Sequence, residues 1–344
     1  MLSINFNCFN LGVSGGIRVI LELANRSAAL DNKVSITAIG SKKDLEWYNN
    51  PIRADLCFAS TSRTSWLFRL LPWWHSSVDM QAQLLSGVIP DSDINVATFC
   101  FTAEPTVKIG KGKLFCLVQG YEPWFFDNAD LKAKAEASYN LPLTKLCVSR
   151  WLQEKVGGEY IGNGTNTEIF HPSNSFEDKE PNSILYLHRG FLSKGSNLAM
   201  ETLQHTYNLN PKVKIHIVAK KNARIAAGFP HLLHVDLLDT ELAELYSKVR
   251  VLLYTSSFED FGLPPLEAFA SGTNVVSTNF LGNEYLVDDY NCYLANDFRK
   301  LAFQAQKLLS DDNVSLRQIG SAAKTVQKHD LNLVTDRMLK VFSR

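Results

Sequence analysis

Short runs of apolar residues alternate with longer segments of helical periodicity along almost the whole chain. A short apolar run is typical of a buried strand, whereas apolar residues spaced three or four apart indicate an amphipathic helix. In the first half this pattern predicts strands at residues 3–9, 34–39, 94–99, 114–118 and 145–149, with helices at 17–30 and 131–139. Strands and helices that alternate in this way are typical of a parallel α/β sheet.

A second alternation follows the stretch at residues 172–182, PSNSFEDKEPN, which is polar, contains two prolines and predicts a linker. The second half is expected to hold strands at 184–187, 214–218, 249–254 and 274–277, with helices at 197–205, 241–247, 264–270 and 299–309. Residues 314–342 continue in a helical pattern with no strand after them. We therefore expect two doubly wound domains, with ligands bound between the carboxyl ends of their strands.

Composition narrows the class of protein. The 344 residues are 45% hydrophobic and 20% charged, so the chain can bury sizeable cores. Thirty-five basic residues balance 35 acidic ones, which argues against a general nucleic-acid binder but leaves room for a local anion site. No apolar run is long enough to span a bilayer. The N-terminal residues 1–10 are expected to form a strand and lack the features of a signal peptide.

The six cysteines are scattered and form no C-x-x-C pair. All except Cys57 lie in or beside predicted strands, where a free cysteine behaves as a small apolar residue. We therefore expect a cytoplasmic protein.

A glycine-rich turn, Gly12 to Gly16, joins the first predicted strand to the first helix. Glycines at such a junction let a ligand approach the backbone, and the N–H groups at the helix start favour an anion. The segment does not match G-x-G-x-x-G, and the second strand ends without the acidic residue of a dinucleotide site. A turn without a ligand remains the alternative.

The segment 256–272 contains the most informative motif. It follows the apolar strand that ends at Tyr254, and its two prolines predict a helix that starts near Pro264. Glu259 is then expected on the loop, where its carboxylate can accept hydrogen bonds from hydroxyls, and Glu267 in the first turns of the helix. Alternatively, Glu259 is a solvated loop residue and Glu267 only complements the helix dipole.

Glu259 and Glu267 have the E-x7-E spacing, within EDFGLPPLEAFASG, and this segment resembles the retaining nucleotide-sugar glycosyltransferases of family 4. Residues 163–172 resemble the family's N-G-x-D-x-x-x-F-x-P segment, with Asn166 in place of the aspartate. His188-Arg189 followed by Lys194-Gly195 is similar to its G-R…K-G element, and Gly15-Gly16 to its glycine turn. The resemblance runs through most of residues 1–310.

The resemblance implies the GT-B fold, in which two Rossmann-like, doubly wound parallel-sheet domains face each other across a cleft. Residues 1–162 would form the acceptor domain and residues 163–325 the donor domain, with a last helix at about 326–344 packing back on the first. The implied catalytic residues are Arg189, Lys194 and Glu259. The implied donor-binding residues are Gly15, Gly16, Gln119, Asn163, Gly164, Asp260, Phe261, Gly262, Leu263 and Glu267.

The roles of Arg189 and Lys194 also make physical sense. Both follow a predicted strand end, where a departing diphosphate would accumulate negative charge. Arginine forms bidentate contacts to phosphate and lysine adds a compact charge. The alternative for each residue is a solvated surface side chain.

Several positions depart from the family pattern. Gln119 stands where many relatives have a histidine, and glutamine cannot act as an acid or base, although its amide can orient a sugar hydroxyl. The wording Q-x-Y-E-P-W-F resembles a subgroup that includes bacterial rhamnosyltransferases. Glu122 is expected either to contact the acceptor or donor, or to cap its loop. Asp260 and His188 stand where relatives often have glycine.

Two further segments have competing interpretations. Asp91-Ser92-Asp93 matches the D-x-D metal motif of another glycosyltransferase fold, but a polar entry to the next strand is the preferred interpretation, and we expect no essential metal. The segment from Trp66 to His75 contains three tryptophans. It is expected either to cover the first-domain sheet, or to recognise the acceptor through Trp73 and Trp74 or contact a membrane.

The sequence thus predicts a retaining, metal-independent hexosyltransferase without a cofactor, which moves a sugar from a nucleoside diphosphate to a hydroxyl of a glycan or lipid-linked glycan. Such an enzyme would act in bacterial-type polysaccharide or glycoconjugate synthesis, at the inner face of the membrane or free in the cytoplasm. A nucleotide-sugar epimerase of the same fold and an inactive glycosyltransferase-like partner subunit are the alternatives. Retention of Arg189, Lys194, Glu259 and Glu267 favours the enzyme over the inactive subunit.

Overall fold

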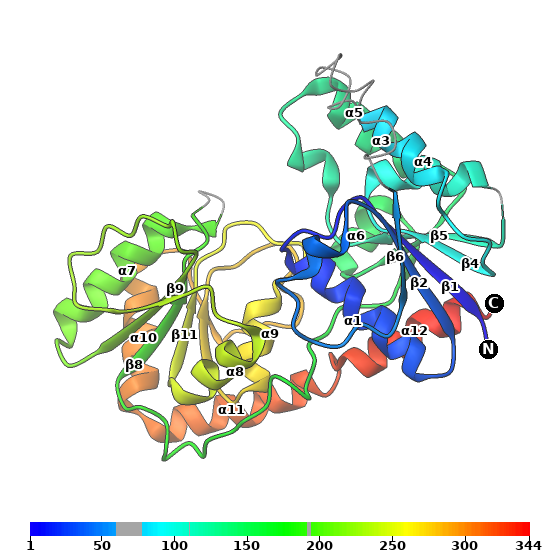
Figure 1. Cartoon of the computed structure of the whole chain (residues 1–344). Coiled ribbons are helices and arrows are strands. Elements are labelled where there is room, and N and C mark those ends of the chain that lie inside the picture. The colour runs from blue at the N-terminus through cyan, green and yellow to red at the C-terminus, as the bar shows by residue number, and fades with distance from the viewer. Residues whose placement is uncertain (60–77, 110, 191–193) are drawn as a thin grey trace. The chain divides into compact units, whose positions relative to one another are not determined.

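The structure, a computed structural model, describes residues 1–59, 78–109, 111–190 and 194–344. The chain divides into two units, each with its own parallel sheet (Figure 1). The first unit contains Met1–Gly162 and Asn332–Arg344, and the second contains Asn163–Leu331. Both sheets are covered by helices, and the fold is the predicted pair of Rossmann-like α/β domains.

The first unit has a seven-stranded sheet in the order β3-β2-β1-β4-β5-β6-β7, in which every paired strand is parallel to its neighbour. The strands are β1 (Ser3–Cys8), β2 (Lys33–Ile39), β3 (Asp55–Ala59), β4 (Ile94–Ala97), β5 (Lys113–Val118), β6 (Thr144–Cys147) and β7 (Glu159–Tyr160). The helical elements are α1 (Gly15–Ala29), η1 (Lys42–Leu45), α3 (Val78–Ser86), α4 (Cys100–Ile109), η3 (Glu122–Phe125), α5 (Ala129–Ser138), α6 (Arg150–Val156) and, at the end of the chain, α12 (Leu331–Phe342).

The second unit has a six-stranded parallel sheet in the order β10-β9-β8-β11-β12-β13. Its strands are β8 (Ser183–Leu187), β9 (Lys214–Ala219), β10 (Leu232–Val235), β11 (Val251–Tyr254), β12 (Asn274–Ser277) and β13 (Tyr293–Leu294). Its helices are α7 (Ser196–Leu209), α8 (Asp239–Lys248), α9 (Leu263–Ala270), α10 (Phe298–Ser310) and α11 (Asp312–Val326).

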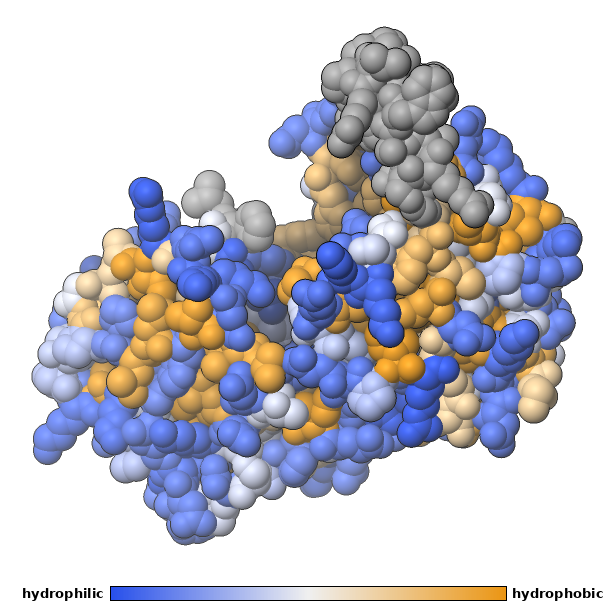
Figure 2. Space-filling view, in the orientation of Figure 1, coloured by the Kyte–Doolittle hydropathy of each residue, from blue (hydrophilic) through white to orange (hydrophobic). Residues whose placement is uncertain are grey.

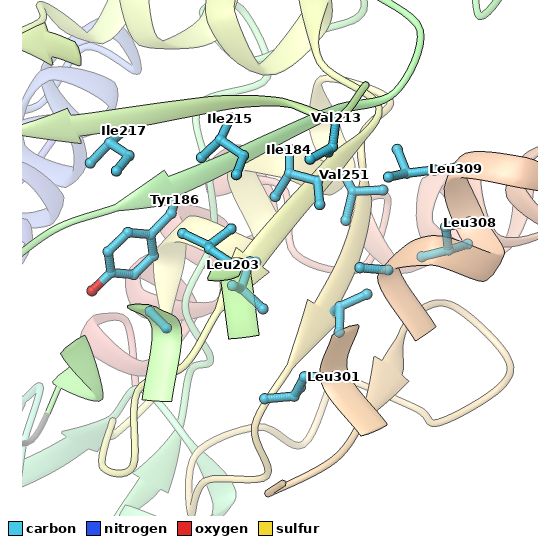
Figure 3. Close-up of a cluster of buried hydrophobic side chains, with 14 of the residues drawn as sticks. Ile184, Tyr186, Leu203, Val213, Ile215, Ile217, Val251, Leu301, Leu308 and Leu309 are labelled. Carbon is cyan, nitrogen blue, oxygen red and sulfur yellow. The ribbon is translucent and has the colours of Figure 1, made fainter. Parts of the chain in front are cut away.

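One face of the second sheet carries a large apolar core, shown in Figure 3. Alternate residues of β8 and β9, among them Ile184 and Ile215, point toward side chains of α7 and α10 such as Leu203 and Leu301. All four are almost fully buried. Because each buried aliphatic side chain contributes about 1.5–3 kcal/mol, this layer gives the strand ends a rigid support.

The segment at residues 172–182 is not a linker between the two units, because all of it lies within the second unit. Lys179 is buried there, and its Nζ donates to the carbonyl oxygens of Ser247 at 2.6 Å and Val249 at 3.3 Å. Burial, together with the nearby Arg250, lowers the pKa of Lys179 to about 8. A polar composition therefore predicted a linker where the chain in fact carries a buried, hydrogen-bonded lysine.

The surface in Figure 2 mixes hydrophilic and hydrophobic residues over both units. No helix in the described ranges is both long enough and apolar enough to cross a membrane. The six cysteines are free thiols, and Cys57, which the pattern did not assign to a strand, lies in β3.

Candidate functional site

The loops after β8 and β11 bring together the three residues expected to be catalytic. Tyr186 of β8 pairs with Leu253 of β11, so the two strands end side by side. Because they are parallel, their carboxyl ends lie at one edge of the sheet. Arg189 and Lys194 follow the first strand, and Glu259 follows the second.

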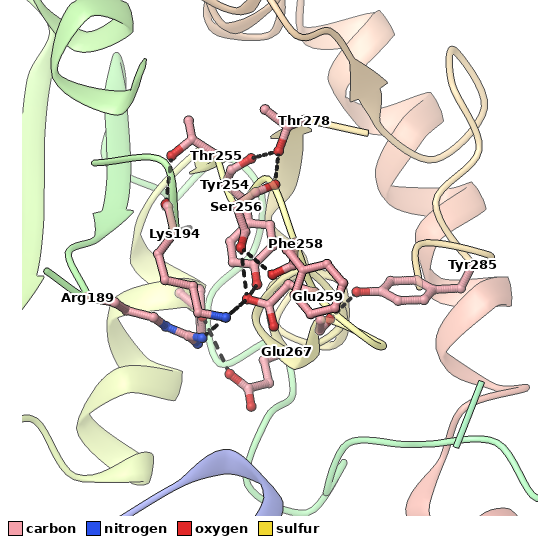
Figure 4. A network of polar contacts seen from close by, with 12 residues as sticks. Arg189, Lys194, Tyr254, Thr255, Ser256, Phe258, Glu259, Glu267, Thr278 and Tyr285 are labelled. Atoms are coloured by element: carbon pink, nitrogen blue, oxygen red, sulfur yellow. Dashed lines mark hydrogen bonds and ion pairs between the residues drawn. The ribbon is translucent and has the colours of Figure 1, made fainter. Parts of the chain in front are cut away.

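Four side chains converge on one oxygen of Glu259 (Figure 4). Lys194 Nζ lies 2.8 Å from Oε1 and Arg189 Nη1 lies 3.6 Å from it. The hydroxyls of Tyr254 and Ser256 donate to the same oxygen at 2.5 and 3.1 Å. The arrangement is a preformed cluster of two cations and one carboxylate.

The charges in this cluster stabilise one another. Burial alone would raise the pKa of Glu259, but Lys194 and Arg189 outweigh burial and hold the pKa below its usual value. Burial opposes the charged form of Arg189 as well, yet Tyr254 and Glu259 raise the pKa of its guanidinium. The pKa of the Tyr254 hydroxyl is raised, first by its burial and then by the adjacent Glu259, so it stays a hydrogen-bond donor.

The cluster keeps capacity for a ligand. The side chain of Arg189 is 38% exposed and that of Lys194 is 24% exposed. In the described part of the chain, the Arg189 guanidinium makes no hydrogen bond and nothing donates to Glu259 Oε2, which is not a buried atom. An anion can therefore bind Arg189, and a hydroxyl can donate to Glu259 Oε2.

The loop between β11 and α9 is fastened from the opposite side. Thr278 Oγ1 donates to the carbonyl oxygen of Ser256 at 2.5 Å, and the Gly282 N–H donates to that of Glu259 at 3.0 Å. The Tyr285 hydroxyl donates to the carbonyl of Gly262. Gly262 has a φ of +80°, and a Cβ at this position would lie 2.7 Å from Phe280 Cζ, so the turn into α9 requires glycine.

Gly195 fixes the Lys194 backbone against β11. Its φ is +67°, and an added Cβ would lie 1.8 Å from the carbonyl oxygen of Thr255. Thr255 Oγ1 in turn donates to the Gly195 carbonyl at 3.0 Å. This close approach explains why glycine follows the lysine.

The predicted helix start within the E-x7-E segment is confirmed. Helix α9 begins at Leu263, with Pro264 and Pro265 in its first turn. Glu267 is 2% exposed, and the Tyr246 hydroxyl lies 3.5 Å from its Oε2. Glu267 is thus a buried residue, and Glu259, whose side chain is 14% exposed, is not the solvated loop residue of the alternative interpretation.

The other donor-binding candidates of this unit lie in buried, closely packed segments of the chain. Asn163 Oδ1 accepts from the Gly164 N–H at 2.9 Å, and a Cβ on Gly164 would lie 2.6 Å from the His329 carbonyl oxygen. The ring of His329 lies 5.7 Å from that of Phe261. Asp260 and Phe261 are both buried. This segment braces the loop of Glu259 from within the same unit.

In the first unit, the glycine turn meets Gln119. Ser14 caps α1 by accepting from the Ile17 N–H at 3.0 Å, and the helix starts at Gly15, two residues before the predicted start, so Gly15 and Gly16 lie in its first turn. An added Cβ on Gly16 would lie 3.4 Å from Gln119 Nε2. The structure therefore places Gln119 beside the Gly15-Gly16 turn.

Glu122 is buried, and its carboxylate accepts from the Cys100 N–H at 2.5 Å, at the start of α4. This contact favours the loop-capping interpretation over contact with a substrate. Trp73 and Trp74 lie outside the described residues.

The aspartates of the D-x-D motif have partners within the fold. Asp93 Oδ2 accepts from the Ser3 N–H and hydroxyl, both at 2.8 Å, and Asp91 Oδ2 lies 2.8 Å from Lys111 Nζ. Among the residues that the structure describes, no group of three or more His, Cys, Asp or Glu side chains could hold a metal ion.

Two polar contributors to the cluster were not singled out from the sequence. Tyr254 ends a strand of otherwise apolar residues, and Ser256 is an ordinary loop residue. A tyrosine at the carboxyl end of an apolar strand, immediately before the loop of Glu259, was the available signal for Tyr254.

Most of the second unit matches a known protein family. Residues 168–326 match the model of the family described as Glycosyl transferases group 1. The second unit contains a glycosyl transferases group 1 domain. No curated protein matches the chain.

Solved structures extend this likeness to the whole chain. HepE of Anabaena, solved in complex with UDP-glucose, is 17% identical with a TM-score of 0.77, and both chains are fully covered. Sucrose-phosphate synthase of Thermosynechococcus elongatus is 16% identical with a TM-score of 0.75, over 100% of this chain and 98% of the other. A variant of S. aureus TarM, in complex with fondaparinux, α-GlcNAc-glycerol and UDP, is 12% identical with a TM-score of 0.80, and both chains are fully covered. At these identities the likeness shows the fold, which is GT-B as predicted.

Proposed function

We propose that the chain is a retaining glycosyltransferase of family 4 that moves a sugar from a nucleoside diphosphate to a hydroxyl acceptor. The observation that carries the proposal is the cluster of Arg189, Lys194 and Glu259 in a glycosyl transferases group 1 domain. The UDP and UDP-glucose bound to HepE and the UDP bound to the TarM variant support a nucleotide-sugar donor. A role in polysaccharide or glycoconjugate synthesis, and a deoxyhexose donor, follow from the sequence resemblance.

Breaking the bond between the anomeric carbon and the diphosphate oxygen leaves its electron pair on the diphosphate. Positive charge then builds on the sugar and negative charge on the leaving group. Arg189 and Lys194 stabilise that negative charge, and preorganised donors of this kind contribute about 2.7–4 kcal/mol each. Glu259 Oε2 accepts from the sugar hydroxyls, Glu267 binds the ribose, and the Gly15-Gly16 amides add N–H donors for the anion.

The acceptor hydroxyl attacks the anomeric carbon from the face that the diphosphate leaves, which retains the configuration. Its proton passes to the departing phosphate oxygen, so the atoms balance without a side-chain base. Gln119, beside the glycine turn, orients a sugar hydroxyl through its amide.

The two fixed cations supply the charge that a divalent metal provides in other transferases. We therefore expect transfer to continue in the presence of a chelator. Activity that is abolished by chelation and restored by manganese would contradict this part of the proposal.

The first test is a thermal-shift screen of the purified chain with UDP, GDP, dTDP and their sugars. Stabilisation by at least one nucleotide is expected because binding to the folded state raises its melting temperature. Absence of a shift with every nucleotide would overturn the proposal. Conversion of the donor into another nucleotide sugar without transfer would identify an epimerase instead.

The second test is the variant Lys194→Ala, which is expected to lower kcat by about 10²–10³ because it removes one leaving-group donor. Lys220→Ala is the matched control, since Lys220 is an exposed lysine of the same unit whose ion pair with Asp236 spans 3.8 Å. Equal rates for Lys194→Ala and the control would reject the assignment.

A further inference from the structure

A pocket of about 480 Å³ opens in the first unit at the carboxyl ends of β1 and β2. The β1–α1 turn forms one side of it, and the chain from η1 to Trp47 forms the other. Its lining includes Asn10, Val13, Lys43, Asp44, Glu46 and Trp47. Its volume lies within the range of about 300–1,000 Å³ that is usual for small-molecule sites.

The aromatic side of the pocket is rigidly held. Trp47 Nε1 donates to the carbonyl oxygen of Leu11 at 2.9 Å, which ties the ring to the β1–α1 turn. Its ring meets that of Tyr48 edge to face at 5.8 Å, and the Tyr48 hydroxyl donates to the buried Glu22 at 2.8 Å. Because its N–H is already satisfied, Trp47 offers carbon surface to whatever enters the pocket.

The polar groups of the pocket are partly occupied and partly available. Asn10 Oδ1 accepts from the Gly12 N–H at 3.0 Å, and Asp44 Oδ2 accepts from the Ser41 N–H at 2.7 Å, so both side chains are oriented. Lys43 and Glu46 are exposed, and neither side chain has a hydrogen bond or ion pair within the described part of the chain. The pocket thus presents both donors and acceptors around a fixed indole.

We propose that this pocket binds one pyranose ring of a neutral glycan, as the acceptor site of the transferase; this rests on the function proposed above. A pyranose has an apolar face of C–H groups that can lie on an indole and a rim of hydroxyls that both donate and accept. Lys43 and the Asn10 amide can donate to those hydroxyls, and Asp44 and Glu46 can accept from them.

Charge selects the neutral sugar over an anionic ligand. The lining holds one cation, Lys43, and two carboxylates, Asp44 and Glu46. A phosphate group would meet a net negative wall, whereas hydroxyls bond equally well to ammonium and carboxylate groups. The pocket shares the β1–α1 turn with Gly15 and Gly16, so its occupant would lie beside the segment that is proposed to receive the donor.

The test uses saturation-transfer NMR on the full chain with four probes: the methyl pyranosides of glucose, galactose, mannose and rhamnose, with glucose 6-phosphate as the anionic comparison. At least one neutral probe is expected to receive saturation, and the phosphate is expected to receive less. Trp47→Ala should weaken binding of that probe about tenfold, while Trp47→Phe keeps a stacking surface and most of the binding.

Val13→Trp provides a second variant that fills the pocket without removing a wall, because Val13 is 58% exposed. It should also abolish saturation of the probe. Trp124→Ala is the matched control, since Trp124 is a half-exposed tryptophan of the same unit outside the pocket, and it should leave probe binding unchanged.

Three results would each overturn the proposal. None of the four neutral probes receives saturation, the phosphate receives more than they do, or binding is lost in Trp124→Ala but not in Trp47→Ala and Val13→Trp. The thermal shift with nucleotides separates the two proposals. A shift without sugar binding would reject the acceptor pocket and leave the transferase proposal standing, whereas no shift would reject the transferase itself.

Discussion

At the scale of single residues, the site depends on one carboxylate oxygen that contacts two cations, so the three side chains keep a net positive charge. Glu259 Oε1 is within 3.6 Å of Arg189 and within 2.8 Å of Lys194, and two hydroxyls complete its surroundings. An ion pair that is partly buried is stable only when its remaining hydrogen bonds are satisfied. Tyr254 and Ser256 meet that requirement at Oε1, whereas Oε2 and the Arg189 guanidinium, within the described part of the chain, keep hydrogen-bonding capacity for a ligand.

Gly195 allows a test of the backbone that carries Lys194. Gly195→Ala should lower the free energy of unfolding by about 2–5 kcal/mol, because the new Cβ meets the Thr255 carbonyl oxygen in a left-handed conformation. Gly190→Ala is the matched control. Its φ of +71° is similar, but no atom of the described residues lies within 4 Å of the added Cβ, so a cost of only about 1–2 kcal/mol is expected.

Urea unfolding of the two variants measures the difference. Equal losses of unfolding free energy in the two variants would show that the close approach to Thr255 does not affect stability.

At the scale of elements, the edge of the second sheet contains a hydrogen-bonded chain of titratable groups. His216 of β9 lies 3.0 Å from His234 of β10 through their ring nitrogens, and 2.7 Å from the carboxylate of Glu180. Lys214 also contacts Glu180, at 2.8 Å. These hydrogen-bonded side chains join β9 and β10 to the segment that precedes β8.

This arrangement predicts a loss of stability in acid. Burial lowers the pKa of both His216 and His234 below the ordinary 6.5, so the folded state holds them neutral more strongly than the unfolded state does. Their contribution is present above pH 6.5 and is lost as the pH falls below it, because the unfolded chain then binds more protons. Unfolding free energies measured across this range should decrease.

The variant His234→Gln should flatten that decrease, while replacement of the exposed-loop residue His171 by Gln serves as the control. A pH dependence unchanged by His234→Gln would contradict the assignment. Glu180 acts in the same direction at lower pH, because its own folded pKa is depressed despite burial, by Lys214 and His216.

At the scale of the whole molecule, the chain crosses from the first unit to the second and returns. The C-terminal helix α12 ends with Phe342, which is 1% exposed and whose ring lies 4.7 Å from that of Phe115 in β5. Arg337 Nη1 donates to the Ile161 carbonyl at 3.3 Å, and Arg344 lies 3.3 Å from Glu159. The last residues are therefore part of the first unit's packing.

The variant Phe342→Ala should destabilise the first unit by about 3–5 kcal/mol, because it leaves a cavity against β5. Leu333→Ala lies on the same helix at a position that is 41% exposed, and it should cost far less. The unfolding transition of each variant in denaturant, detected by limited proteolysis, measures the loss of stability. Similar midpoints for the two variants would show that α12 does not anchor the first unit.

Much of this architecture was predictable, because local patterns determine it. Helix α9 starts at Leu263, between a glycine and two prolines, and the central strands of both sheets fall in the predicted apolar runs. The short or outer strands β3, β7, β10 and β13 were not predicted. Strand β10 was missed because it lies at a sheet edge, and its Leu232, Leu233 and Val235 are all partly exposed, with no alternation to signal a buried face. Helix α4 was missed because Pro105 lies inside it and conceals the helical pattern.

By itself, the sequence determined the two α/β alternations, the glycine turn and the E-x7-E spacing, since each depends on residues that are close along the chain. Only the tertiary structure decided that Tyr254 and Ser256 share Glu259 Oε1 with Lys194, that Gln119 lies against Gly16, and that Trp47 closes a pocket with the β1–α1 turn. It also decided that residues 172–182 belong to the second unit. The reason is geometric: parallel strands bring their carboxyl ends to one edge, and which side chains meet there depends on strand order and register, which no local pattern records.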